Sequence, residues 1–303
     1  ILTNLDLCED NLILDPMNGS GMTTFAAQKQ GIASMGIEIN PAMVRIARAK
    51  NGTFSGRWDL GKIIPSIIRK TKKKKINCSF HEDALGWFSE ETYVTLKCLE
   101  AVILDRKDSD EYPLHPKLET FVNRMHFDRN HGGLCNFFLG ALLLTARRVS
   151  VAQESRNPTW FKPGKIQQKN NLDVLEEFES IIYSMDADLR KAFQVKPDTQ
   201  NFLVLESDAG KLPIKDELID AIITSPPYLT RIDYAVGTSP ELVLLGYESK
   251  EKLRSIRRAT MGSTCVTGGS YEIVQNWGKT CINLLKKITH HPSKASSGYY
   301  LKM

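Results

Sequence analysis

The chain has 303 residues, of which 42% are hydrophobic and 25% charged, with a formal net charge of +5. This composition is ordinary for a soluble globular protein, and no apolar run is long enough to span a bilayer, so we expect no membrane partner. The six scattered cysteines contain no C-x-x-C pair, which argues against a disulfide framework or a zinc site and fits a reducing cytoplasm, where we expect the protein.

The first fifty residues alternate between predicted strands and helices. Residues 11–15 form an apolar run typical of a short buried strand, and a glycine-rich turn leads from it into a predicted helix over 22–29. Residues 33–39 predict a second strand, and a proline opens the predicted helix over 41–50. This order predicts the start of a doubly wound parallel sheet.

The central part of the chain has a different character. Residues 51–79 are polar and basic, with a cationic run over 69–75, and we expect either a solvated loop or a loop that contacts phosphates. Helical patterns follow at 84–104, 134–149 and 172–193. The second of these is strongly apolar but too short to cross a membrane, so it predicts a core helix.

Strand patterns return near the C-terminal third. An apolar strand begins at residue 202, and another over 216–225 is ended by two prolines. Helices are predicted near 239–258 and 271–289. The simplest organisation is one sheet domain made of residues 1–50 and 200–303, interrupted by a mostly helical insertion over residues 51–199.

The turn after the first strand, Asp-Pro-Met-Asn-Gly-Ser-Gly over residues 15–21, has features of a nucleoside pocket. Gly19 and Gly21 remove side chains where a ligand would approach the backbone, and the following helix N-terminus supplies free N–H groups. Glu38, at the end of the second strand, can accept hydrogen bonds from both hydroxyls of a ribose. A turn of this kind also serves as a helix-packing device, so the motif alone leaves both interpretations open.

Two cofactors fit a glycine turn followed by an acid. A dinucleotide site prefers a third glycine where this chain has Thr24, and Asp15 would repel a pyrophosphate, so a nicotinamide dehydrogenase is disfavoured. S-adenosylmethionine has no phosphate and carries a positive sulfonium and ammonium, which suit an acid at the strand end. Met22 and Thr23 are placed to contact its methionine part through their backbone.

A second motif, Thr-Ser-Pro-Pro-Tyr over residues 224–228, follows the last predicted strand. Consecutive prolines fix two φ angles and remove two N–H donors, so that the neighbouring carbonyls and the Ser225 hydroxyl become acceptors in a rigid pocket. Such acceptors can hold an exocyclic amine in line for methyl transfer, while the ring of Tyr228 stacks on its base. A base inside a duplex must be flipped out to reach this pocket. A rigid turn is the alternative interpretation.

Taken together, these motifs resemble those of the DNA amino-methyltransferases. The 15–21 turn and Gly-Ile-Glu-Ile-Asn-Pro over 36–41 are similar to motifs I and II of that family, and 224–228 is similar to its catalytic motif IV. Ser-Pro-Pro-Tyr is typical of its cytosine-N4 enzymes, and Asp- or Asn-Pro-Pro-Tyr of its adenine-N6 enzymes. The resemblance extends from Asp15 to about Tyr300.

The resemblance implies a Rossmann-like S-adenosylmethionine-dependent methyltransferase sheet of the α/β class, with DNA recognition in the insertion and a flipped DNA base as substrate. It also implies cytosine N4 as the favoured target, adenine N6 as the alternative, and a possible cognate restriction endonuclease. The implied cofactor-binding residues are Asp15, Pro16, Gly19, Gly21, Thr23, Glu38, Asn40, Asp208 and Ala209, and the implied catalytic residues are Ser225, Pro226, Pro227 and Tyr228. About four strands can be counted where the family has seven, so we expect a fragment whose sheet is incomplete at the C-terminus.

Other chemistries fit less well. No proline is followed by a cysteine, which disfavours cytosine-C5 methylation, and the histidines lack metal-ligand spacing, so we expect no metal. An RNA or protein-glutamine methyltransferase, or an inactive nucleic-acid-binding remnant, stays open as an alternative. Several basic and aromatic side chains of the insertion either contact a DNA backbone or complete helix dipoles: Arg147, Arg148, Arg156, Trp160 and Lys162.

Overall fold

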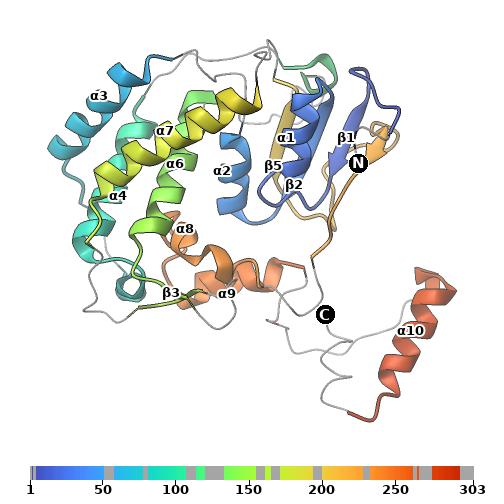
Figure 1. Cartoon of the computed structure of the whole chain (residues 1–303). Helices are drawn as coiled ribbons and strands as arrows, with labels where there is room; N and C mark the ends of the chain where they lie inside the picture. The colour runs from blue at the N-terminus through green and yellow to red at the C-terminus, as the bar shows by residue number, and fades with distance from the viewer. Residues whose placement is uncertain are drawn as a thin grey trace.

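Figure 1 shows the structure of the whole chain, a computed structural model. The residues whose structure is described are 2, 5–50, 58–77, 81–106, 114–119, 133–154, 161–164, 171–193, 200–227, 233–261, 265 and 275–293.

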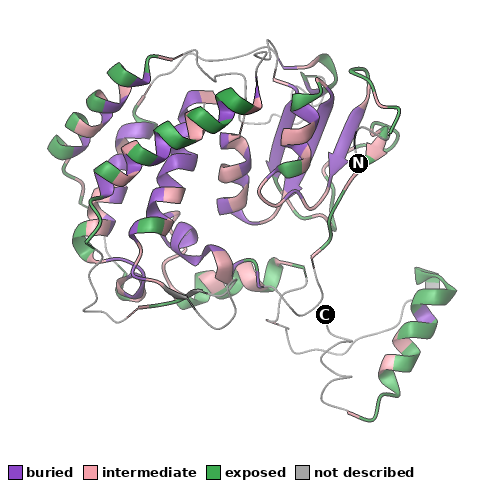
Figure 2. Ribbon diagram, viewed as in Figure 1, coloured by how far each residue is buried: buried purple, intermediate pink, exposed green. Residues whose placement is uncertain are grey.

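Four parallel strands form the main sheet of the described chain: β1 (Leu12–Asp15), β2 (Ala33–Glu38), β5 (Phe202–Glu206) and β6 (Ala221–Ile222). They lie in the order β5-β2-β1-β6. The three longer strands are buried along nearly their whole length, as Figure 2 shows in purple, because both faces of the sheet are covered. The predicted α/β class is confirmed.

The two faces of the sheet are covered differently. On one face, Val204 of β5 packs against Val44 of α2 (Pro41–Ala49), and α1 (Met22–Lys29) packs beside it. On the other face, Met35 of β2 packs with Leu114 and Leu118 of the short segment 114–119. The alternation of side chains along each strand therefore serves two apolar layers.

The largest hydrophobic core lies among helices beside the sheet. Helix α6 (Gly133–Val149) runs through its middle and contacts α2, α4 (Glu90–Leu104), α7 (Val174–Ala192) and α8 (Ser239–Leu244). At Gly140 a Cβ atom would lie 2.2 Å from the Cβ atom of Ala49, so glycine is needed for α6 to approach α2 this closely. Because α2 and α8 share this core, the sheet and the helices form one packed unit, and the division of the chain into two domains stays a prediction.

The solvated loop expected over residues 51–79 is wrong for its central part, which forms helix α3 (Leu60–Lys73). The Asp59 side chain caps this helix, and apolar side chains three or four residues apart, including Ile64 and Ile67, are buried where α3 packs on α4. Three of its four lysines, Lys70, Lys72 and Lys73, fall in the last turn, where positive charge complements the helix dipole. Pro65 inside the helix and the cationic run hid this pattern in the sequence.

Smaller differences concern the C-terminal part. The helix expected over 239–258 is two helices, α8 and α9 (Lys250–Ala259), because the chain turns at Gly246 with φ +93°. The strand expected over 216–225 is limited to β6, and the helix expected over 271–289 is α10 (Lys279–Thr289). Shorter elements of the described chain are η3 (Glu82–Gly86), β3 (Gln153–Glu154), β4 (Phe161–Lys162), η4 (Val236–Thr238) and η5 (Gln275–Trp277).

Within the described ranges, no helix combines the length and the apolar character that crossing a membrane requires.

Candidate functional site

The strand order changes direction beside β1. The chain runs from β1 through β2 to β5 on one side and then returns to place β6 on the other side of β1. The backbone N–H of Ile223 donates a 3.0 Å hydrogen bond to the carbonyl of Leu14, which fixes the end of β6 against the end of β1. In open parallel sheets such a reversal leaves a crevice at the carboxyl ends of the strands, where ligands bind.

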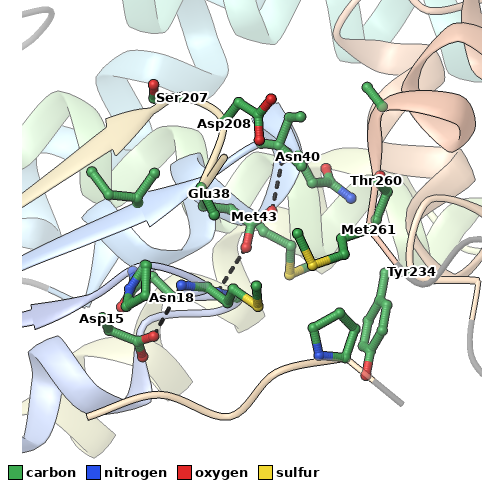
Figure 3. Close-up of a pocket in the computed structure, with 18 of the residues that line it drawn as sticks. Asp15, Asn18, Glu38, Asn40, Met43, Ser207, Asp208, Tyr234, Thr260 and Met261 are labelled. Carbon is green, nitrogen blue, oxygen red and sulfur yellow. Dashed lines mark hydrogen bonds between the residues drawn. The ribbon is translucent and has the colours of Figure 1, made fainter. Parts of the chain in front are cut away.

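A cavity of about 740 Å³ occupies this position, within the roughly 300–1,000 Å³ typical of small-molecule sites. Segments that follow all four strands form one side of it, and segments from the C-terminal part form the other (Figure 3). Its lining comprises Asp15, Pro16, Met17, Asn18, Gly19, Ser20, Met22, Thr23, Ile37, Glu38, Ile39, Asn40, Met43, Ser207, Asp208, Ala209, Gly210, Ser225, Pro227, Tyr234, Arg258, Ala259, Thr260, Met261 and Cys265.

Glu38 is held at the cavity by two backbone groups. Its Oε2 atom accepts a 2.8 Å hydrogen bond from the Gly19 N–H, and its Oε1 atom accepts one of 2.8 Å from the Asn40 N–H. Burial raises the pKa of Glu38 above its ordinary value, an effect that these hydrogen bonds oppose and that the charge of Asp15 reinforces. Each carboxylate oxygen keeps a second lone pair, so the group can still accept from a ligand's hydroxyls.

The turn after β1 is locked onto β2. The Asn18 N–H donates a 2.9 Å hydrogen bond to the carbonyl of Ile37, and the Asn18 side chain is buried over Gly36. A Cβ atom at Gly36 would lie 2.4 Å from Asn18 Cγ, so the strand needs glycine there. Asp15 is also buried, and its Oδ1 atom accepts a 3.1 Å hydrogen bond from the Met17 N–H. This turn therefore presents a fixed carboxylate to the cavity.

Gly21 has a different role from the ligand approach that the sequence predicted. Its φ of +84° requires glycine, and a Cβ atom there would lie 2.7 Å from the Cβ atom of Ala47 in α2. Gly21 does not line the cavity, so it permits packing of α1 on α2, the helix-packing interpretation that the sequence had left open. Of the two motif I glycines, only Gly19 faces the cavity.

The ends of β5 and β6 bring the other predicted residues to the same place. The Ser207 N–H donates a 3.0 Å hydrogen bond to the Glu38 carbonyl, which joins the two strand ends. Asp208 and Ala209 then line the cavity beside Glu38, and Ser225 and Pro227, in the segment that follows β6, also line it. Pro226 is exposed and lies outside the lining, and Tyr228 lies outside the described residues.

The wall opposite the sheet was not predicted from the sequence. It comes from Tyr234 and from residues 258–261, of which the first two end α9. Figure 3 shows Tyr234, Thr260 and Met261 across the cavity from Asp15. An ion pair of 2.8 Å between Asp233 Oδ2 and Arg257 Nε holds α9 against the segment that contains Tyr234. No local pattern could indicate it, because its residues reach the cavity only through tertiary packing. Met43 also lines the cavity and was not predicted. Its position in the first turn of α2, directly after motif II, is a signal that could have indicated it.

The basic residues of the insertion differ in the partners that they have within the protein. Arg147 has internal partners, because its Nε atom lies 2.5 Å from Oε1 of buried Glu241 and its Nη2 atom donates to the Gly237 carbonyl. Arg148 pairs with Glu177 at the surface, at 2.9 Å. Lys162 ends β4, whereas Arg156 and Trp160 lie outside the described residues. Among described residues no group of histidine, cysteine, aspartate or glutamate is placed to hold a metal ion.

Comparison with known proteins adds independent information. The chain is 25% identical over 87% of its length to the Type II methyltransferase M.BsoBI of Geobacillus stearothermophilus, and 25% identical over 74% to M.MjaII of Methanocaldococcus jannaschii. It is 23% identical over 71% of its length to M.MvaI of Kocuria varians. The matches cover 52%, 55% and 46% of these relatives, so the chain spans about half their length.

Neither a family model nor a solved structure matches the chain. The parallel sheet, the cavity at its carboxyl edge and the three relatives nevertheless agree with one another and with the motifs. Over 71–87% of its length, the chain is thus similar to Type II methyltransferases.

Proposed function

We propose that the chain provides the cofactor-binding and catalytic part of an S-adenosylmethionine-dependent enzyme that methylates an exocyclic amine of a DNA base, with cytosine N4 as the target. The observation that carries this proposal is the shared cavity of Gly19 and Ser225, which follow adjacent parallel strands. A nucleoside held over Gly19 then has its reactive end toward the segment that holds the amine. The similarity to Type II methyltransferases supports the reaction class.

The residues around motifs I and II fit the cofactor. Asp15 supplies a buried negative charge for its cationic part, and Glu38 supplies oriented lone pairs for ribose hydroxyls. Asp208 and Ala209, at the end of the neighbouring strand, are assigned to its adenine ring. When bound, the cofactor supplies a methyl group on a positively charged sulfur. Pro16, Thr23 and Asn40 complete this side of the cavity.

Ser225 and Pro227 hold the target amine in the proposed reaction. The Ser225 hydroxyl and the carbonyls beside the prolines accept the two N–H hydrogens, which orients the nitrogen lone pair toward the methyl group. The bond from the nitrogen to the methyl carbon would form as the bond from that carbon to the cofactor's sulfur breaks, which would leave a neutral thioether, and the nitrogen would lose one proton to solvent. Pro226 acts by fixing the backbone, and Tyr228 is assigned to stacking on the flipped base. Tyr234 adds an aromatic ring on the opposite wall of the cavity.

The proposed site also assigns different functions to two parts of the chain. Residues 1–50 and 200–303 carry the strand ends that line the cavity, and residues 51–199 are assigned to DNA recognition. Because the chain spans about half of its relatives, further recognition residues in a longer protein are compatible with the proposal. A cognate restriction endonuclease is a proposed partner, which follows from the resemblance of the motifs alone.

The test is transfer of label from methyl-tritiated cofactor to DNA, RNA and protein, followed by digestion of the labelled DNA. We expect label in DNA and 4-methylcytosine in the digest. Label found only in 6-methyladenine refutes the cytosine assignment, and label found only in RNA or protein refutes the DNA assignment. A chain that fails to bind the cofactor in calorimetry refutes the enzymatic proposal as a whole.

A further inference from the structure

Helix α9 has the composition of a nucleic-acid contact. Its ten residues, Lys250–Ala259, contain five lysines or arginines and one glutamate. None of its residues is buried, and Figure 2 shows it exposed along the lower edge of the molecule. Leu253 and Ile256 are partly buried against the helical core, so the helix has a packed side and a free side.

The position of α9 relative to the cavity is fixed by the fold. Its last residues, Arg258 and Ala259, line the cavity together with Thr260 and Met261. The ion pair of Arg257 with buried Asp233 holds this end of the helix against the segment that follows the proposed amine clamp. The C-terminal end of α9 is therefore part of the rim through which a flipped base would enter.

The cationic side chains of α9 differ in whether they already have a partner within the protein. Arg257 pairs with Asp233, Lys250 pairs with Asp83 at 3.1 Å, and Lys252 Nζ donates to the Gly246 carbonyl. Arg254 and Arg258 are both exposed, and neither forms an ion pair or hydrogen bond with another described residue. They lie four residues apart, so they occupy one face of the helix. Two guanidinium groups that have no acidic partner among the described residues thus lie along α9, and the second of them is at the rim.

We infer that Arg254 and Arg258 bind the phosphates of the DNA strand that flank the flipped nucleotide. This inference rests on the proposed function, because a base inside the cavity must remain attached to a backbone that crosses the rim. Arginine is suited to this position because its planar guanidinium binds phosphate through two hydrogen bonds. The contact is independent of sequence, so it supplies affinity and orientation while other residues read the bases.

The test compares two double variants that remove equal charge. R254Q/R258Q changes the proposed contact and keeps good helix-forming residues in α9. K286Q/K287Q removes two exposed lysines of α10, a helix that lies outside residues 51–199 and that Figure 1 shows apart from α9. Binding of a fluorescent mixed-sequence duplex is measured by anisotropy at several salt concentrations, with cofactor affinity and thermal unfolding as checks.

We expect R254Q/R258Q to weaken DNA binding on the order of tenfold and to reduce the salt slope of log K by about 1.8, or about 0.9 per lost phosphate contact. K286Q/K287Q should change the slope by less than half of that. The melting temperature should stay unchanged in both double variants, and cofactor affinity should stay unchanged in K286Q/K287Q, whose residues do not line the cavity.

Four outcomes would overturn the inference. An unchanged slope in R254Q/R258Q, with a wild-type chain that binds DNA, defeats it while leaving the proposed function standing. Equal effects of both double variants would show that net charge rather than position matters. Loss of cofactor affinity without a change of slope would place Arg258 in the cofactor site instead. A wild-type chain that binds cofactor but no DNA defeats the proposed function itself, and the inference with it.

Discussion

The backbone N–H of Gly19 donates a 2.8 Å hydrogen bond to Oε2 of Glu38, and this contact joins the turn after β1 to the end of β2. The carboxylate thereby orders the glycine turn and is itself oriented at the cavity. A single side chain thus links the two motifs that were recognised separately in the sequence. Its dual role leads to the first two predictions.

Replacement of Glu38 by glutamine should weaken cofactor binding by about 10- to 100-fold, because hydrogen bonds to a charged acceptor are worth about 1.5–3 kcal/mol and an amide nitrogen cannot accept them. Isothermal titration with S-adenosylmethionine measures this change. The matched control is E206Q, which alters the exposed glutamate at the end of the neighbouring strand β5. Equal affinities for E38Q and E206Q would contradict the assignment.

Cofactor affinity should also depend on pH through Glu38. Burial raises the pKa of this carboxyl above 4.5, so it takes up a proton at a less acidic pH than an exposed glutamate does. The ionised form is the one that binds, so affinity should be full at neutral pH and should fall as the pH decreases through the raised pKa. Titrations between about pH 5 and 8 should show this decline in the wild type and its absence in E38Q. A pH-independent wild-type affinity would contradict the prediction.

Removal of the Ser225 hydroxyl should slow methyl transfer without weakening cofactor binding. Ser225→Ala deletes one acceptor of the proposed amine clamp, and loss of one such oriented group costs on the order of 10²-fold in rate. Single-turnover transfer of tritiated methyl to DNA gives the rate, and calorimetry gives the affinity. Ser255→Ala is the control, because Ser255 is an exposed serine of α9 that does not line the cavity. An S225A rate equal to that of S255A would remove Ser225 from the reaction.

A methyl group at Gly36 should disturb the turn after β1. Its Cβ atom would lie 2.4 Å from Asn18 Cγ, and such overpacking costs about 1–3 kcal/mol of the free energy of unfolding. Gly36→Ala should therefore lower the melting temperature and the cofactor affinity together. In the double variant G36A/N18A the clash is absent, so part of both losses should be recovered.

The control for this pair is Gly61→Ala in the first turn of α3. There a Cβ atom would meet only the flexible end of Asp59, at 3.3 Å. G61A should leave the cofactor affinity unchanged, and it should leave the melting temperature unchanged or slightly higher because alanine favours the helix. If G36A and the G36A/N18A double variant are equally damaged, the contact between Asn18 and Gly36 is not the cause.

The sequence by itself determined the elements whose signals are local. The strands and helices over residues 12–49 follow from apolar runs, a glycine turn and a proline at a helix start, and their ends agree with prediction to within a residue or two. The residues at the ends of the strands and just after them could be assigned to one edge of the sheet, because the carboxyl ends of parallel strands lie together. Asp15, Glu38 and Ser225 reach one cavity for this reason.

Only the tertiary structure decided what closes the cavity and what the ambiguous glycines do. Residues 258–261 and Tyr234 lie far from motif I along the chain, and they reach it through the packing of α9 and the ion pair of buried Asp233 with Arg257. Gly19 and Gly21 belong to the same motif, yet Gly19 lines the cavity and Gly21 packs against Ala47. The difference arises because helix α2 covers one side of the turn and leaves the other side open to the cavity. Local sequence fixes the conformation that a segment prefers, whereas its neighbours in space are set by the burial of the whole chain.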